Sequence, residues 1–196
     1  MSGATRIPKA EIKGPFGYVF KRISRRMLGE VPDGAAVMWQ NRPVLMALMG
    51  LGRKVEKWAQ LDANLKSFAH TAVAAQVGCS FCLDYGYFNA HNAGLDEAKA
   101  SEVPRWREST VFTPLERDVM EYAEAMTETP PRVTDALSAR LLEQLGAPAL
   151  VELTAVVGFA NLSARGNTAM GIESQEFSKV CARPLAQPSP GYAKSA

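Results

Sequence analysis

Two cysteines with two residues between them, Cys79 and Cys82, are the pair in this sequence with the clearest chemistry. Thiols at this spacing can close into a small disulfide ring and open again, as dithiol oxidoreductases require. Gly78 precedes the pair and permits a tight turn into a helix. We therefore expect Cys79 near a helix N-terminus, where the helix dipole favours a thiolate, with Cys82 one turn further along.

Zinc binding and a purely structural role are the alternatives to a redox pair. Structural zinc sites use four protein ligands, commonly as two Cys or His pairs. Cys181 stands alone near the end of the sequence, and His70 and His91 are 21 residues apart. We therefore predict no metal ligand. Two buried thiols without chemistry are the second alternative, and the redox pair is the favoured hypothesis.

His70 is the residue that we expect to exchange a proton with the cysteines. It lies nine residues before Cys79, on the helix that leads to the pair, and imidazole titrates near neutral pH. His91 falls on the opposite side of a continuous helix from Cys82, at about 100° per residue. Asp84 is also turned away from Cys82, and we expect it to bind backbone or a neighbouring subunit.

The composition indicates one globular domain. The chain has 196 residues, 47% of them hydrophobic, and a formal net charge of +2. This charge does not point to a nucleic-acid partner. The longest apolar run, 43–51, is too short to cross a membrane, so no membrane partner is predicted. Because we see no export signal, we predict a cytoplasmic protein, in which a close cysteine pair is not a disulfide scaffold.

Helical periodicity predominates, and the chain is predicted to be all-α. Residues 1–16 form an irregular arm in this prediction, 17–182 a single helical domain, and 183–196 a flexible tail. The expected helices in the first half cover 37–57, with an interruption near Pro43, then 61–77, 79–93 and a short 95–101. In the second half, one helix starts at the capping box of Thr113 and Glu116. Two more follow: the first ends at Gly146, and the second begins there and ends at Gly171.

Residues 78–85, followed by Gly94 and Leu95, resemble the cysteine helix of the carboxymuconolactone decarboxylase/alkylhydroperoxidase D-like family. Residues 112–117 and 151–171 resemble the segments that follow it. The resemblance covers about 43–177. It implies an alkylhydroperoxidase D-like helical bundle with the CxxC at the start of a core helix, usually in a homo-oligomer.

The resemblance also implies a thiol peroxidase that needs no cofactor. Cys82 would be the attacking thiol, which a hydroperoxide converts to a sulfenic acid, and Cys79 the resolving thiol that condenses with it to a disulfide. A dithiol partner, lipoylated or thioredoxin-like, would then reduce the disulfide. The decarboxylase branch generally lacks the cysteine pair, so decarboxylation is disfavoured.

Two residues of the family's proton relay are absent. Family peroxidases carry a glutamate twelve residues before the first cysteine, where this chain has Ser67, and a histidine four residues after the second, where it has Gly86. His70 lies one turn after Ser67, and we interpret it as the substitute base.

Two further hypotheses stay open. One is a redox-sensing or structural oligomer whose cysteine pair oxidises without turnover. The other is a carboxylate- or lactone-processing enzyme of the same fold that uses Arg165. Asn161 and Arg165 are spaced i, i+4 and share a helix face, either as a structural network or as a carboxylate pocket.

Overall fold

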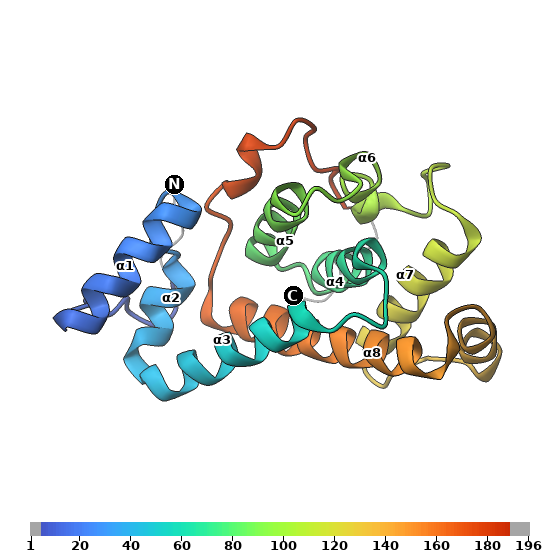
Figure 1. The fold of residues 1–196 in the computed structure, drawn as a ribbon, viewed down its shortest axis with the longest axis horizontal. Helices are drawn as coiled ribbons and strands as arrows, with labels where there is room; N and C mark the ends of the chain where they lie inside the picture. The colour runs from blue at the N-terminus through green and yellow to red at the C-terminus, as the bar shows by residue number, and fades with distance from the viewer. Residues whose placement is uncertain (1–4, 189–196) are drawn as a thin grey trace.

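The computed structural model describes residues 5–188, which form α-helices and short 3-10 helices and, within that range, no strand. Helix α4 (Ala63–Val77) lies at the centre of the larger part of the molecule (Figure 1). Helices α5 (Ser80–Asn92), α7 (Pro114–Thr127) and α8 (Asp135–Met170) pack around it. The all-α prediction is confirmed, with the CxxC at the start of a core helix.

Helix α4 can be surrounded because its buried positions are mostly small. Their small side chains let three helices approach one axis, and Phe68 fills the remaining space against Phe112. The buried positions of α4 are Leu65, Phe68, Ala69, Thr71, Ala72, Val73, Ala74 and Ala75.

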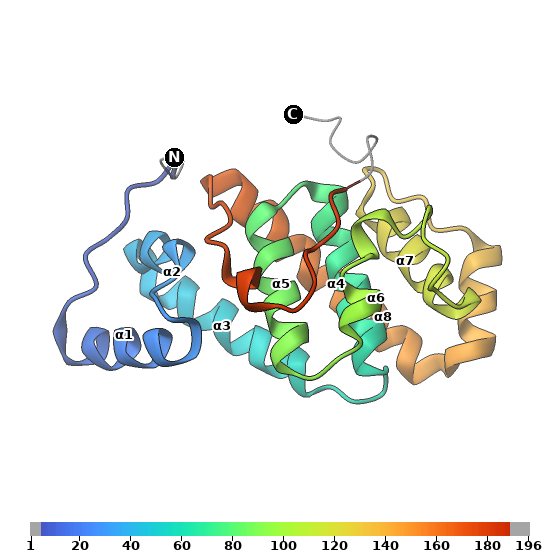
Figure 2. The same cartoon turned by 90° about the horizontal axis from the view of Figure 1, so that it is seen from above.

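Three helices, α1 (Gly14–Leu28), α2 (Asp33–Met38) and α3 (Arg42–Lys57), form the N-terminal end of the molecule (Figures 1 and 2). The 3-10 helix η1 (Trp39–Asn41) joins α2 to α3. Ile12, Trp39 and Leu45 make a small separate core there.

Both prolines near these helix starts lie in the first turn, where a missing N–H costs nothing. Pro15 therefore belongs to α1, and the irregular arm predicted for 1–16 ends at residue 13. Pro43 likewise begins α3 instead of interrupting a longer helix. Residues 1–4 of the predicted arm lie outside the described residues.

The second half of the chain begins and ends its helices where the sequence predicts. In the capping box of α7, Glu116 N donates to Thr113 Oγ1 at 3.3 Å and Thr113 N donates to Glu116 Oε2 at 2.7 Å. Helix α8 bends at Gly146, which has a φ of 76°, and ends at Gly171. By length and composition α8 could span a membrane. It packs against α4 and α7 as the core helix.

Beyond α8, residues 172–188 run back across α5 towards α6 (Glu97–Ala100) (Figure 2). This C-terminal segment contains the 3-10 helix η3 (Phe177–Val180). Ala186 N donates to Ser101 O at 2.8 Å, and Leu185 packs against the core. Residues 183–188 of the predicted flexible tail are therefore held against the domain, because their backbone groups find partners. Residues 189–196 of that tail lie outside the described residues.

Candidate active site

The turn between α4 and α5 places the two cysteines. Gly78 caps α4 in the left-handed conformation, with a φ of 76°, which glycine adopts without a steric penalty. Its N–H bonds to the carbonyls of Ala74 and Ala75, and Cys79 N bonds to Ala74 O at 3.0 Å. Cys79 is the N-cap of α5, as the sequence predicts.

Cys79 and Cys82 form a disulfide in this structure, with their Cα atoms 5.3 Å apart. The N–H of Cys82 points at Cys79 Sγ, 3.2 Å away, so a sulfur takes the place of the usual capping oxygen. The N–H groups of the first turn give this end of α5, where both cysteines lie, a positive partial charge. This field favours negative charge on either sulfur when the disulfide is open.

Asn167 is a contact of the pair that the spacing of the cysteines does not reveal. It is buried on α8, and its side-chain N–H donates to Cys82 Sγ at 3.4 Å. A fixed donor at this point stabilises a thiolate more than a thiol. The only feature of the sequence that could have indicated this contact is an amide side chain on an otherwise apolar face of the helix.

The imidazole of His70 packs against Gly86. A Cβ atom at position 86 would lie 3.2 Å from His70 Nδ1 and 3.4 Å from Cε1. Gly86 follows Cys82 by four residues and so lies one turn further on the same side of α5. The ring, projecting from α4, thus occupies the space beside position 86. Burial lowers the pKa of His70 below its ordinary value of 6.5, so the ring is neutral at pH 7.

Both sulfurs are shielded from solvent, although the residues beside them are not. Cys79 is 1% exposed and Cys82 4%, whereas Gly78 and Ser80 are exposed. The C-terminal segment covers the start of α5: Ser174 N donates to Ser80 Oγ at 3.1 Å, and Phe177 packs edge-on against Phe81. The C-terminal segment thus lies over the first turn of α5, which carries the cysteines.

Asp84 fastens that cover, in agreement with the prediction that it binds backbone. Its buried carboxylate accepts four hydrogen bonds from the C-terminal segment, at 2.7–3.2 Å. Burial alone would raise its pKa, but the bonds from Ser178, Ser174 and Phe177 outweigh burial and lower the pKa below 3.8. The donors are Ser174 Oγ and the backbone N–H groups of Gln175, Phe177 and Ser178.

Asn161 and Arg165 form the structural network that the sequence allowed. Asn161 Nδ2 donates to Thr127 Oγ1 at 2.9 Å, and Arg165 donates to Asn161 Oδ1 and to Thr127 O. Together they tie α8 to the C-terminal end of α7. In this structure the guanidinium of Arg165 therefore takes part in the structural network between the two helices.

A hollow lies between the C-terminal segment and the 3-10 helix η2 (Val103–Arg105), away from Cys79 and Cys82. It has a volume of about 360 Å³. We do not treat it as the reaction site, because no predicted site residue lines it. Its lining residues are Ser101, Glu102, Arg105, Arg183, Pro184, Leu185 and Ala186.

The third cysteine is not set up as a nucleophile. Burial and the nearby charges of Glu97 and Asp84 raise the pKa of the Cys181 thiol to about 11, so it is protonated at neutral pH. Cys79 and Cys82 therefore remain the predicted redox pair.

Solved structures with this architecture define its class. A peroxidase-related protein from Ralstonia eutropha JMP134, described as an alkylhydroperoxidase AhpD core, superposes with a TM-score of 0.76 at 16% identity, over 89% of this chain and 95% of that one. A cysteine-to-alanine variant of the debrominase Bmp8, in complex with 2,3,4-tribromopyrrole, superposes with a TM-score of 0.74 at 18% identity, over 90% of this chain and 95% of that one. The fold is thus that of the alkylhydroperoxidase D-like proteins.

Sequence comparison gives the family. The pattern of the carboxymuconolactone decarboxylase family matches residues 43–125. The uncharacterized protein YnjA of Escherichia coli K12 is 37% identical over 161 residues, which are 81% of this chain and 87% of that protein. The chain belongs to the carboxymuconolactone decarboxylase family.

Proposed function

We propose that this protein is a thiol peroxidase-like oxidoreductase that reduces hydroperoxides through a Cys79–Cys82 dithiol/disulfide cycle. The observation that carries the proposal is the pair itself: two bonded sulfurs at the first turn of α5, with Asn167 donating to Cys82 Sγ at 3.4 Å. The first-turn N–H groups and this amide both favour a thiolate on Cys82 once the disulfide is reduced.

The proposed cycle has three steps. The Cys82 thiolate attacks one peroxide oxygen, a sulfur–oxygen bond forms, the oxygen–oxygen bond breaks, and an alcohol or water leaves with a proton. The Cys79 thiolate then attacks the sulfenic sulfur of Cys82, which releases water and closes the disulfide. A dithiol protein, lipoylated or thioredoxin-like, supplies two electrons and two protons and becomes a disulfide itself.

His70 is the proposed proton carrier in this cycle. Its neutral ring can accept the proton of the Cys82 thiol, directly or through one water molecule, and return it to the leaving alkoxide. The support for this role is its position against Gly86, one turn beyond Cys82, together with its lowered pKa. The imidazole thus stands in for the histidine that family peroxidases carry at position 86.

Counting hydroperoxide molecules consumed per chain, with dihydrolipoamide as the reductant, tests the proposal. We expect repeated turnover in the natural protein and none in Cys82→Ser. The matched variant Cys79→Ser keeps the attacking thiol and loses the resolving one, so in the absence of the reductant it should consume a single equivalent and stop as a sulfenic acid. Full turnover in Cys82→Ser would overturn the assignment of the nucleophile.

A redox-sensing pair that oxidises without turnover is the second candidate, and the burial of both sulfurs favours it. A pair that is 1% and 4% exposed reacts only when its cover opens, which suits a slow switch. In the same assay such a protein consumes one equivalent of hydroperoxide and does not cycle. Repeated turnover decides against it.

Because the fold is similar to that of a debrominase, a brominated compound is a second substrate to try in the turnover assay. A dithiol can replace a carbon–bromine bond by a carbon–hydrogen bond, with bromide as the leaving group and a disulfide as the oxidised product. 2,3,4-Tribromopyrrole in place of the hydroperoxide shows whether the Cys79–Cys82 pair serves that reaction instead.

We also propose that the protein is a cytoplasmic homo-oligomer. The supporting observation is on α1, where Val19, Ile23 and Met27 recur at helical spacing and are exposed. A second copy that covers this face would remove these side chains from water. Light scattering of the full chain measures the assembly, and a monomer at all concentrations would contradict it.

A further inference from the structure

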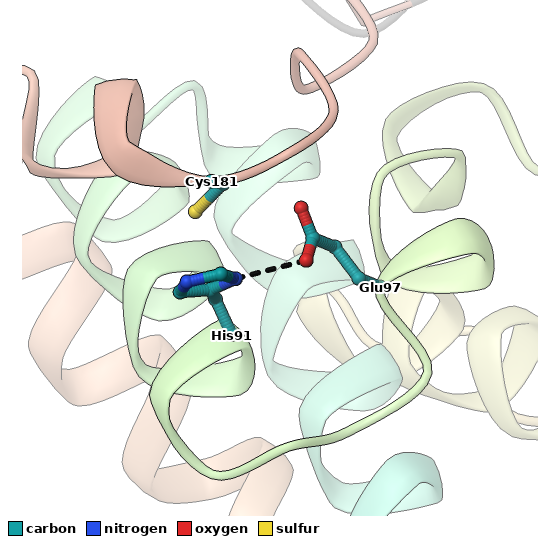
Figure 3. A group of neighbouring side chains, drawn as sticks. All are labelled: His91, Glu97 and Cys181. Atoms are coloured by element: carbon teal, nitrogen blue, oxygen red, sulfur yellow. Dashed lines mark hydrogen bonds and ion pairs between the residues drawn. The ribbon is translucent and has the colours of Figure 1, made fainter.

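A second group of reactive side chains lies at the other end of α5, away from the cysteine pair. His91 lies in the last turn of α5, Glu97 begins α6, and Cys181 follows η3 (Figure 3). One ring nitrogen, one carboxylate oxygen and the thiol sulfur all lie within 4.8 Å of one another. All three residues are half-buried, so a small ion can reach them without unfolding the chain.

Groups outside the cluster hold the carboxylate of Glu97 through one of its two oxygens, and His91 contacts the other. Its Oε1 atom accepts from Arg183 N at 3.0 Å and lies 3.2 Å from the hydroxyl of Tyr87. Its Oε2 atom faces inward and lies 2.8 Å from His91 Nδ1. Outer partners that fix one carboxylate oxygen and leave the other directed at a common point are the arrangement that orients metal ligands.

The donor set matches a borderline-soft divalent ion. Imidazole, carboxylate and thiolate are the three ligand types of Zn²⁺, at about 2.0–2.3 Å, and a water molecule can complete a tetrahedron. One carboxylate and one thiolate together balance the two positive charges. The thiolate disfavours Mg²⁺ and Ca²⁺, which prefer oxygen ligands alone. Glu97 and Asp84 both act electrostatically on Cys181, so the surroundings attract a cation.

We propose that His91, Glu97 and Cys181 bind a transition-metal dication, with Zn²⁺ the best match, and that the ion fastens the C-terminal segment to α5 and α6. The sequence argument against zinc counted Cys181 and His91 as unconnected, and the fold brings them together. The ion would add a clamp to the segment that Asp84 already holds by four hydrogen bonds. This site is independent of the proposed peroxidase cycle.

The oxidised protein makes a clean test, because the chain has three cysteines and two of them form the disulfide. Cys181 is then the single thiol. Co²⁺ added to this protein should bind in equimolar amount and produce the near-ultraviolet absorption of a thiolate–cobalt bond, and Zn²⁺ should displace it. Cys181→Ser should remove that band, and Glu97→Gln should weaken binding.

Two further variants distinguish the site from its alternatives. Tyr87→Phe removes an outer partner of Glu97 together with a donor to Arg183 O, and leaves all three proposed ligands in place. It should weaken Co²⁺ binding about 10-fold while keeping the band. The double variant Cys79→Ser/Cys82→Ser lacks the redox pair and should keep both the band and the affinity. Absence of the band in the natural protein, or its survival in Cys181→Ser and loss in the double variant, would overturn the proposal. Circular dichroism confirms that each variant is folded.

Discussion

The two ends of helix α5 are built in opposite ways. At its N-terminal end, Gly78, Cys79 and Cys82 are close neighbours in the sequence, and both sulfurs are buried in the main core. At its C-terminal end, His91 meets residues from α6 and from the C-terminal segment in a half-exposed, negatively charged setting. The first end brings its two sulfurs together through local spacing, whereas the second brings His91, Glu97 and Cys181 together only through the complete fold.

Asp84 lies between the two ends, and its removal tests how far they depend on each other. Asp84→Ala leaves four donors of the C-terminal segment without their acceptor, so we expect the free energy of unfolding to fall by about 3 kcal/mol in urea denaturation. Asp135→Ala, at an exposed position in the first turn of α8, is the matched control and should cost about 0.5 kcal/mol. A loss as small as the control's would mean that the segment is held mainly elsewhere.

Two variants that remove the imidazole from α4, or place one on α5 instead, test the role of His70 at the N-terminal end of α5. His70→Gln should slow the reaction of Cys82 with hydroperoxide about 100-fold, because it removes the proton carrier. The double variant His70→Ala/Gly86→His returns an imidazole from α5 to the space that His70 occupied, and should recover part of the rate. Stopped-flow kinetics of the reduced protein measures both. An unchanged rate in His70→Gln would remove His70 from the mechanism.

A smaller effect is expected at Asn167, the long-range contact of the N-terminal end. Asn167→Leu removes the donor to Cys82 Sγ, so the thiol pKa should rise by about one unit, a factor of about ten in thiolate at neutral pH. The pH dependence of thiol alkylation measures this. Asn92→Leu is the control, since Asn92 is exposed and donates to Phe88 O at the far end of α5. Equal pKa values in the two variants would show that the amide does not stabilise the thiolate.

The smallest effect is a pH dependence of stability that belongs to His70. Its pKa is lowered in the folded chain, so the unfolded chain binds more protons as the pH falls below 6.5. The contribution of His70 to stability is therefore complete above pH 6.5 and is lost as the pH falls from there through the lowered pKa. Urea denaturation should show this loss in the natural protein and less of it in His70→Gln. The same slope in both proteins would assign it to other groups.

The helices in the second half of the chain could be predicted from the sequence, because their limits are encoded locally. Thr113 and Glu116 form their capping box, Gly146 bends α8, and Gly171 ends it. The predictions of an irregular arm through residues 14–16 and of an interruption near Pro43 are wrong. A proline in the first turn of a helix and a proline that stops a helix look alike when the register of the neighbouring helix is unknown.

The candidate site was predictable only in its local part. The positions of Cys79 and Cys82 follow from a glycine and a spacing. The donor on Asn167 lies 85 residues beyond Cys82, and the packing of His70 on Gly86 depends on how α4 crosses α5. Cys181 approaches His91 because the C-terminal segment runs back over α5, and the periodicity of the sequence does not predict this path. Such contacts are decided by the tertiary packing, not by neighbouring residues.

The 85 residues that separate Asn167 from Cys82 also matter during synthesis. At roughly 5–20 residues per second, the cysteines leave the ribosome roughly 4–17 seconds before the amide that contacts them. The segment that shields them emerges later still. Throughout that interval the nascent thiols lack both the amide contact and the covering segment that they have in the folded chain.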